Sequence, residues 1–340
     1  MNRDIPIGAL SIRQENYLDE TLLRESYDLV ISVIGWETRG LSCLPSLVNR
    51  SEDIFLLHFE SVGEFMCDEK SKNMEKIDRL LNNSQKIELK VSTNFSDNTE
   101  LIQDAIHGVY KKKSRALNVL IDITCMPKRY ILFILGLGFR RELFSSIDIL
   151  YAEAEKYELT SSAVGTERPQ IGLVSQGNWT SEQIPYLEAE NYVPDKRDLF
   201  ISVGAEITEA TPIVNRFEPN NLTLFHIDQG NLRLPNSLMD KERPALDQLL
   251  AYSGVKEERF KLNDVAGVAL SILQQSKCGT TCLAIGPKTH AVAFALAALA
   301  NRNIEVVCRS PEKYIVNDVK PSGVRYFYRI QDRFDPLSYM

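Results

Sequence analysis

Short runs of β-branched and apolar residues alternate along the chain with segments whose apolar residues recur at helical spacing. Asp28 to Ile34 is one such run, and it leads into Gly35, which is typical of a buried strand that ends in a turn. Thr99 to Lys111 places its apolar residues on one helical face. The pattern also predicts strands at 54–59, 87–91, 117–123, 146–151, 199–203, 222–227, 281–285 and 304–308, and helices at 73–81, 129–144, 244–253, 265–275 and 289–301.

A series of short motifs occurs twice, in the same order and with similar gaps. Such self-similarity indicates a duplication, although any chain of alternating strands and helices produces weak echoes of this kind. The matched residues are Ser32 and Ser202, His58 and His226, Pro127 and Pro287, and Lys156 and Lys313. Alternating strands and helices imply parallel sheets with covered faces. We therefore predict an α/β protein of two tandem Rossmann-like lobes with mainly parallel sheets, related by a pseudo-two-fold axis.

The predicted boundaries follow from this duplication. Residues 1–175 form the first lobe, 176–196 a linker and 197–340 the second lobe. Gly and Pro residues crowd the stretch after residue 159, yet a structureless segment of this length is uncommon in a compact protein. We expect its first part to be a hairpin that completes the first lobe. The run at 324–330 then reads as a late strand of the second lobe.

Composition narrows the classes of function. The 340 residues are 44% hydrophobic and 25% charged, which excludes a mostly disordered chain or a coiled coil. A net charge of −7 argues against extended nucleic acid as a partner but permits a local basic site for a small anion. The N-terminus has no apolar signal region, and the apolar stretches at 130–139 and 291–300 are too short to span a membrane. We expect a cytoplasmic protein without membrane contact.

The sequence offers no metal or cofactor motif. Its six cysteines are scattered, which suits a reduced compartment, and no second pair or nearby histidine completes a zinc set around Cys278 and Cys282. The glycine fingerprint of dinucleotide-binding folds, the phosphate loop, the serine-hydrolase elbow and the zinc-protease motif are all absent. We therefore predict no cofactor, no metal ligand and no catalytic residue.

Two matching turns are candidates for ligand binding. Each follows a buried strand and precedes an apolar helix, where free backbone N–H groups attract anions. The first contains Thr124 and Lys128, and the second contains Gly286, Lys288 and His290. A lysine here adds a charge suited to phosphate, and a glycine permits close approach of a ligand. Alternatively, each Pro simply begins a helix and each Lys is solvated.

The loops after the first strand of each lobe are further candidates. Trp36 is suited to stacking on a base, and Arg39 to pairing with a phosphate beside Glu37. The corresponding loop, with Gly204 and Glu206, is acidic and lacks both groups, so the first lobe is expected to hold the richer site. The alternative is a Trp that caps the core next to an exposed Glu–Arg pair.

Two equivalent histidines end the second strand of each lobe. His58 and His226 are each followed, after one residue, by Glu60 and Asp228. A histidine beside a carboxylate can act as a general acid or base, but a histidine in a strand is more often structural.

A Rossmann-like lobe whose strand ends in Asp-x-Thr, here Asp122 and Thr124, before a turn with Lys128 resembles the CARF domains of CRISPR-associated proteins. Two such lobes in one chain resemble the SAVED domain of antiphage signalling systems. The chain departs from the CARF turn, because Cys125-Met126 stands in place of Gly-Gly and Pro precedes the Lys in both lobes. The resemblance implies a cyclic oligonucleotide or similar nucleotide bound between the lobes.

Three hypotheses for function follow. The first is a non-catalytic sensor of a nucleotide second messenger, in a bacterial antiphage or stress system, that acts on a separate effector protein or ATPase. The second is a metal-independent nucleotide phosphodiesterase that resembles ring nucleases. The third is an interaction subunit of an ATPase or nuclease complex, without a working ligand site.

Overall fold

The computed structural model describes residues 4–60, 66–81, 84–90, 95–155, 175–190, 197–228, 236–277, 279–314 and 318–333. Within it the chain divides into two compact units. Unit 1 consists of residues 1–130, 137–155 and 317–340, and unit 2 of residues 131–136 and 156–316. The chain thus builds most of unit 1, then unit 2, and returns to unit 1 at its end.

Unit 1 contains an eight-stranded sheet in the order β1-β2-β14-β7-β6-β3-β4-β5. The run from β5 to β7 is parallel, and β14, β2 and β1 add to it in antiparallel fashion. Its strands are β1 (Ile5–Ile7), β2 (Leu10–Glu15), β3 (Leu29–Ile34), β4 (Ile54–Phe59), β5 (Ser84–Leu89), β6 (Leu117–Asp122), β7 (Phe144–Ala154) and β14 (Pro321–Asp332). Its helices are η1 (Glu20–Leu22), η2 (Thr38–Leu41), α1 (Leu44–Leu47), α2 (Cys67–Leu80), α3 (Phe95–Lys113) and α4 (Lys128–Arg140), the last of which is shared with unit 2.

Unit 2 contains a six-stranded sheet in the order β11-β10-β9-β12-β13-β8, parallel except for β8. Its strands are β8 (Ser175–Gln183), β9 (Arg197–Ser202), β10 (Asn221–Ile227), β11 (Lys256–Phe260), β12 (Gly279–Ala284) and β13 (Ile304–Tyr314). Its helices are η3 (Ile207–Ala210), α5 (Thr211–Phe217), α6 (Asn236–Leu250), α7 (Val265–Gln275) and α8 (Lys288–Ala300). The five parallel strands of the two units have the same order, which confirms the α/β prediction of two mainly parallel, Rossmann-like sheets.

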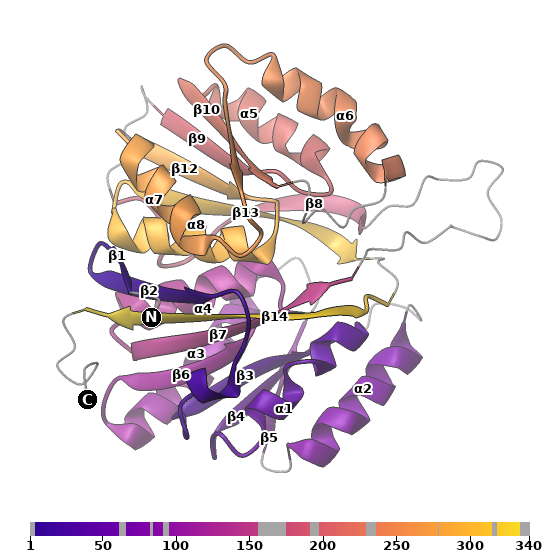
Figure 1. Ribbon diagram of the computed structural model, residues 1–340, viewed down its shortest axis with the longest axis vertical. Coiled ribbons are helices and arrows are strands. Elements are labelled where there is room, and N and C mark those ends of the chain that lie inside the picture. Colours follow the sequence, from indigo (N-terminus) through magenta and orange to yellow (C-terminus); the bar gives the residue numbers. More distant parts are fainter. Residues whose placement is uncertain are drawn as a thin grey trace. The chain divides into compact units, whose positions relative to one another are not determined.

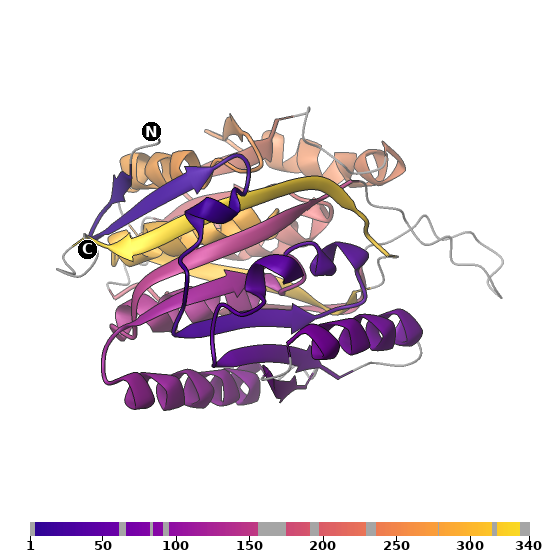
Figure 2. The ribbon, with the colours of Figure 1, turned by 60° about the horizontal axis from the view of Figure 1, so that its bottom comes forward.

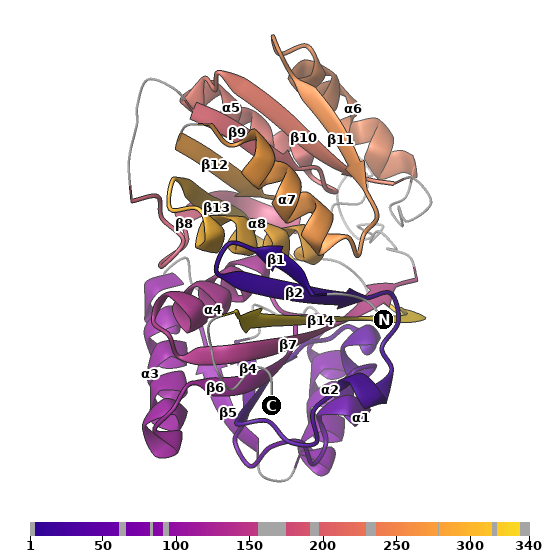
Figure 3. The ribbon, with the colours of Figure 1, turned by 60° about the vertical axis from the view of Figure 1, so that its left-hand side comes forward.

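The helices cover both faces of each sheet. In unit 1, α1 and α2 lie on one face, and α3 and α4 lie on the other (Figure 3). The first face of unit 1 buries a cluster that includes Leu44, Ile77 and Leu120. In unit 2, Val214 of α5 and Leu249 of α6 pack against the sheet in a second cluster. Strands buried on both faces need apolar residues at nearly every position, which is why β3 reads as LVISVI, apolar except for Ser32, rather than as an alternating pattern.

One antiparallel strand of each unit comes from an unexpected part of the chain. β14, predicted for the second lobe, pairs with β7 and β2 of unit 1, where the yellow strand lies between magenta and indigo ones (Figures 1 and 2). β8, which covers the start of the predicted linker between the lobes, pairs with β13 of unit 2, whereas the predicted hairpin falls on residues that lie largely outside the described ranges. The two predictions for these strands were wrong, because an apolar strand pattern does not say which sheet edge the strand joins.

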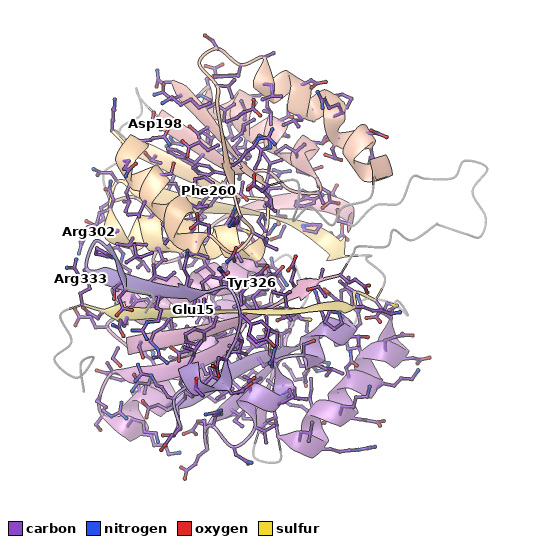
Figure 4. The ribbon with its side chains drawn as sticks, viewed as in Figure 1. Glu15, Asp198, Phe260, Arg302, Tyr326 and Arg333 are labelled. Atoms are coloured by element: carbon purple, nitrogen blue, oxygen red, sulfur yellow. The ribbon has the colours of Figure 1, made fainter. Side chains whose placement is uncertain are left out.

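Side chains fix β14 in place on β7. Arg329 donates through its Nε and Nη2 to the two oxygens of Asp148, which is fully buried, at 2.7 and 2.6 Å. Tyr326, labelled in Figure 4, stacks on Tyr151 with ring centroids 6.2 Å apart and donates its hydroxyl to Glu153 at 2.8 Å. These cross-strand partners set the register of β14.

The element predictions were otherwise close. β4 and α7 match their predicted bounds, and most other elements agree within a few residues. The predicted helix 244–253 is an exception, because α6 begins at Asn236 and contains Pro244 inside it. Pro was taken as a helix start, which is its commonest helical position.

Candidate functional site

The carboxyl ends of β3 and β6 in unit 1, and of β9 and β12 in unit 2, lie where the strand order reverses. Ligands of open α/β sheets bind at this point. Each of these strands leads into one of the loops or turns that the sequence singled out. The fold therefore places the predicted residues of each unit at its own reversal point.

In unit 1 the loop after β3 is held by a side chain of α2 and by an ion pair within the loop. Asn73 of α2 donates its Nδ2 to the carbonyl oxygens of Gly35 and Trp36, both at 3.1 Å. Arg39, only 2% exposed, donates its Nε to Glu37 at 2.5 Å. The predicted Glu–Arg pair forms, but its arginine is buried rather than exposed.

The segment before β14 also contacts this loop. The Thr38 N–H and hydroxyl donate to the two carboxylate oxygens of Asp318, each at 2.6 Å. The Arg39 N–H donates to the carbonyl of Val319 at 3.0 Å. Residues from the far end of the chain therefore occupy the loop that was expected to meet a ligand.

The turn between β6 and α4 packs against the same loop. A Cβ built on Gly35 would lie 3.1 Å from the Cβ of Cys125, and one on Gly40 would lie 2.7 Å from its Sγ. Thr124, fully buried, accepts a hydrogen bond from the Ala152 N–H at 3.0 Å. The Thr124 hydroxyl thus supports β7, and Cys125 fills the space between loop and turn.

The corresponding turn of unit 2, between β12 and α8, packs even more tightly against the end of β9 and the loop that follows it. A Cβ on Gly204 would lie 2.8 Å from the Cα of Gly286, and one on Gly286 would lie 1.9 Å from the Oγ of Ser202. Ser202 Oγ is 2.9 Å from Nδ1 of His290. The structure brings Gly204, Gly286 and His290 together, and it gives both glycines a role in packing the turn against β9.

Hydrogen bonds to other segments of unit 2 fix the acidic loop after β9. Glu206 accepts a hydrogen bond from the hydroxyl of Ser175. Arg309 of β13 donates to Glu209 at 2.7 Å, and the Thr208 N–H donates to Glu242 of α6 at 2.8 Å. Glu206 therefore anchors β8 to this loop.

The helices α4 and α8 begin in the same unusual way. Pro127 and Pro287 are their N-cap residues, and neither helix has a side-chain cap. By contrast, Asp264 caps α7 by accepting from the Gly267 N–H at 2.9 Å. The first helical residue is Lys128 in one and Lys288 in the other. A cation at the positive end of a helix is unfavourable, so both helices break a local rule at the same position.

The third residue of each helix differs in kind. Tyr130 of α4 is fully buried, accepts from Nδ2 of Asn98 at 2.6 Å and packs against Phe59 and Phe95. Its counterpart in α8 is His290, which is 1% exposed. Among the residues that the structure describes, Nε2 of His290 and Oγ1 of the fully buried Thr289 have no hydrogen-bond partner.

Burial determines the charge of His290. Burial, together with a smaller contribution from the nearby His226, lowers the pKa of His290 to about 3. The ring is therefore neutral at physiological pH. Burial also lowers the pKa of His226, whose Nε2 lies 3.2 Å from Glu257.

The equivalent strand-end histidine of unit 1 has a similar neighbour. His58 Nδ1 is 2.6 Å from Glu88 on the adjacent strand. In both units the carboxylate beside the histidine thus belongs to the adjacent strand, rather than to Glu60 or Asp228, which directly follow the strand of the histidine. This arrangement suits the structural interpretation of both residues.

Sequence reasoning missed the partners that close these loops. Asp318 lies 280 residues from Thr38, and no local pattern links them. Glu242 and Asn73 are ordinary polar residues of amphipathic helices in sequence.

Within the described ranges, no group of three or more metal-ligating side chains is suited to a metal ion. In the same ranges, no helix combines the length and apolar character that a membrane span requires.

No model of a known protein family matches the sequence, and no curated protein matches it. Among solved structures, a type III CRISPR defence DNA nuclease activated by cyclic oligoadenylate is similar over 86% of this chain and 67% of its own, with 10% identity and a TM-score of 0.44. The functionally unknown protein PA1789 from Pseudomonas aeruginosa PAO1 is similar over 85% and 94%, with 11% identity and a TM-score of 0.23. A universal stress protein from Archaeoglobus fulgidus DSM 4304 covers 84% and 96%, with 9% identity and a TM-score of 0.22. At such identities these proteins transfer no functional residue to this chain.

Proposed function

We propose that the chain is a non-catalytic regulatory protein that binds a nucleotide at the first turn of α8. The observation that carries the proposal is an uncapped helix start with Lys288 at its first position and two buried polar atoms, on Thr289 and His290, without partners in the described structure. A buried polar group without a partner costs about 1–3 kcal/mol and calls for an explanation. A bound ligand supplies one.

The chemistry of the turn suits an anion on one side. The unpaired N–H groups of a helix start attract negative charge, and the ammonium of Lys288 adds to that attraction. An anion here would also offset the unfavourable position of the lysine. A phosphate group is the anion that this combination of backbone N–H groups and lysine suits best.

The Ser202–His290 pair does not support catalysis. A general base works best when its pKa lies near the operating pH, and the pKa of His290 is about 3. This property favours a binding protein over the phosphodiesterase alternative.

The resemblance of the Asp122–Lys128 turn to CARF domains supports the finer part of the proposal. On that basis the ligand is a nucleotide second messenger, the setting is bacterial antiphage defence or stress signalling, and the output is a separate effector protein. Ligand binding would change the effector rather than the ligand.

Titration of the full chain tests the proposal. Cyclic oligoadenylates and nucleoside monophosphates are added to the wild type, Lys288→Ala, Lys128→Ala and the control Lys241→Ala, whose lysine is exposed on α6. We expect Lys288→Ala to weaken binding about tenfold or more, as loss of a charged contact does, and Lys241→Ala to leave it unchanged. Equal binding by all four proteins would contradict the proposed site, and appearance of a cleaved ligand in chromatography would replace the sensor by an enzyme.

A further inference from the structure

The first turn of α8 has a buried side that the phosphate contact does not use. Thr289 Oγ1 and His290 Nε2 belong to consecutive residues, both are buried, and neither has a partner among the described residues. Lys288, one residue earlier, is half-buried. The turn therefore carries one charged group, on Lys288, and two uncharged polar groups, on Thr289 and His290.

The position of His290 is fixed by the chain. Ser202 Oγ lies 2.9 Å from Nδ1, so one ring nitrogen is already satisfied. A side chain at position 286 would displace Ser202, since a Cβ there would lie 1.9 Å from its Oγ. Gly286 thus permits the Ser202–His290 contact, and this contact leaves Nε2 as the ring nitrogen without a partner among the described residues.

The buried side suits an uncharged group. A neutral imidazole and a hydroxyl each offer hydrogen bonds without charge. Transfer of a phosphate group into buried surroundings without a cation is strongly unfavourable. A sugar hydroxyl or the edge of a base can satisfy both atoms without that cost.

We propose that Thr289 and His290 bind an uncharged hydrogen-bonding group of the ligand, so that the site selects nucleotides over inorganic phosphate. The inference rests on the proposed function, because Lys288 and the helix start hold the phosphate in both. It assigns the selectivity to the buried pair and the general affinity for anions to Lys288.

The test compares AMP, ribose 5-phosphate and inorganic phosphate by calorimetry on wild type, Thr289→Val, His290→Gln and Lys288→Ala. Thr289→Val is the sharpest variant, because it keeps the shape of the side chain and removes only the hydroxyl. Replacing a buried polar group that has no partner by an apolar one of the same shape is neutral or stabilising. A purely structural role for the hydroxyl would instead lower the unfolding midpoint.

We expect AMP to bind the wild type at least tenfold more tightly than phosphate, since a site built for hydrogen bonds discriminates against ligands that lack the partner. Thr289→Val and His290→Gln should weaken AMP binding about tenfold and leave phosphate binding unchanged, whereas Lys288→Ala should weaken both. If ribose 5-phosphate binds as tightly as AMP, the uncharged group belongs to the sugar, and otherwise to the base.

The failures are distinguishable. Equal affinities for AMP and phosphate, both weakened by Lys288→Ala, overturn the inference and leave the proposed function intact. AMP binding that depends on Thr289 but not on Lys288 overturns the phosphate contact alone. If the wild type binds none of the three probes, the inference is overturned, and the titration with cyclic oligoadenylates decides the proposed function.

Discussion

Tyr130 and His290 occupy the same position in the two units, the third residue of the last crossover helix, and their surroundings differ. Tyr130 has its hydroxyl bonded to Asn98 and its ring among other aromatic rings. His290 has one nitrogen bonded to Ser202 and the other without a partner in the described structure. The shared strand order therefore positions both residues alike, while the side chains decide whether the position belongs to the core or to a site.

The loops after the first strands show a second difference. Thr38 in unit 1 and Thr208 in unit 2 each donate a backbone N–H to a carboxylate from elsewhere in the chain. The carboxylate is Asp318 in unit 1, on the segment that enters β14, and the buried Glu242 of α6 in unit 2. Only in unit 1 does this contact join the loop to the returning end of the chain.

Removal of β14 should produce the largest effect. A chain that ends at residue 314 lacks the strand between β2 and β7, so we expect unit 1 to lose its structure while unit 2 keeps its parallel sheet. Hydrogen exchange should show fast exchange of amides in β6 and β7 and protection in β9 and β12. Loss of protection in β12 and β13 instead would restore the assignment of this strand to the second lobe.

Truncation of the paired residues should separate core from site. Tyr130→Ala should reduce the free energy of unfolding by about 3–5 kcal/mol, as aromatic truncations in a core do. His290→Ala should reduce it by only about 1–2 kcal/mol, within the usual range of single substitutions, because it also removes an unsatisfied atom. Urea unfolding measures both.

Tyr130→Phe serves as a control for the hydroxyl alone. It leaves the ring in place and removes only the partner of Asn98. Equal losses for the two alanine variants would show that position 290 is an ordinary core position.

The third prediction concerns pH. The unfolded chain protonates His290 near pH 6.5, whereas the native protein keeps it neutral down to about pH 3. Because the unfolded state binds the extra proton, stability should fall as the pH drops from 6.5 to 5, by about 1.4 kcal/mol per pH unit from this residue. His290→Gln should lose most of this dependence in unfolding titrations, and an unchanged slope would mean that the ring is accessible to protons.

The smallest effects are expected in the two loops. Glu242→Ala should reduce the free energy of unfolding by about 1.5 kcal/mol, the lower end for hydrogen bonds to charged groups. Asp318→Ala should reduce it less, because Asp318 is half-buried and Thr38 is exposed. Hydrogen exchange at the Thr38 and Thr208 amides should rise in the matching variant only. A larger loss for Asp318→Ala would reverse the comparison between the loops.

The sequence predicted the parallel strands well because buried strands and amphipathic helices have distinct periods. It also placed Lys128 and Lys288 at corresponding helix starts, since Pro and the following apolar run mark those starts in both repeats. Their role in binding, like that of Trp36 and Arg39, stays a prediction. The pseudo-two-fold relation of the lobes stays one as well.

The rest depended on contacts between distant positions. Asp318 and Thr38 meet only because β14 returns to unit 1, and nothing near residue 318 signals that return. Likewise, the sequence does not show that Gly286 packs against Ser202, and the role of Gly286 in ligand binding stays a prediction. Whether a polar residue is satisfied cannot be read from its neighbours in sequence.

The return of β14 to unit 1 limits how the chain can be divided. A cut between β7 and β8 gives one fragment without β14 and another that carries β14 without its partner strands. The first half therefore lacks one strand of its eight-stranded sheet, whereas the second half contains every strand of the six-stranded sheet. A division of the chain that preserves the eight-stranded sheet must therefore keep β14 together with β1 to β7.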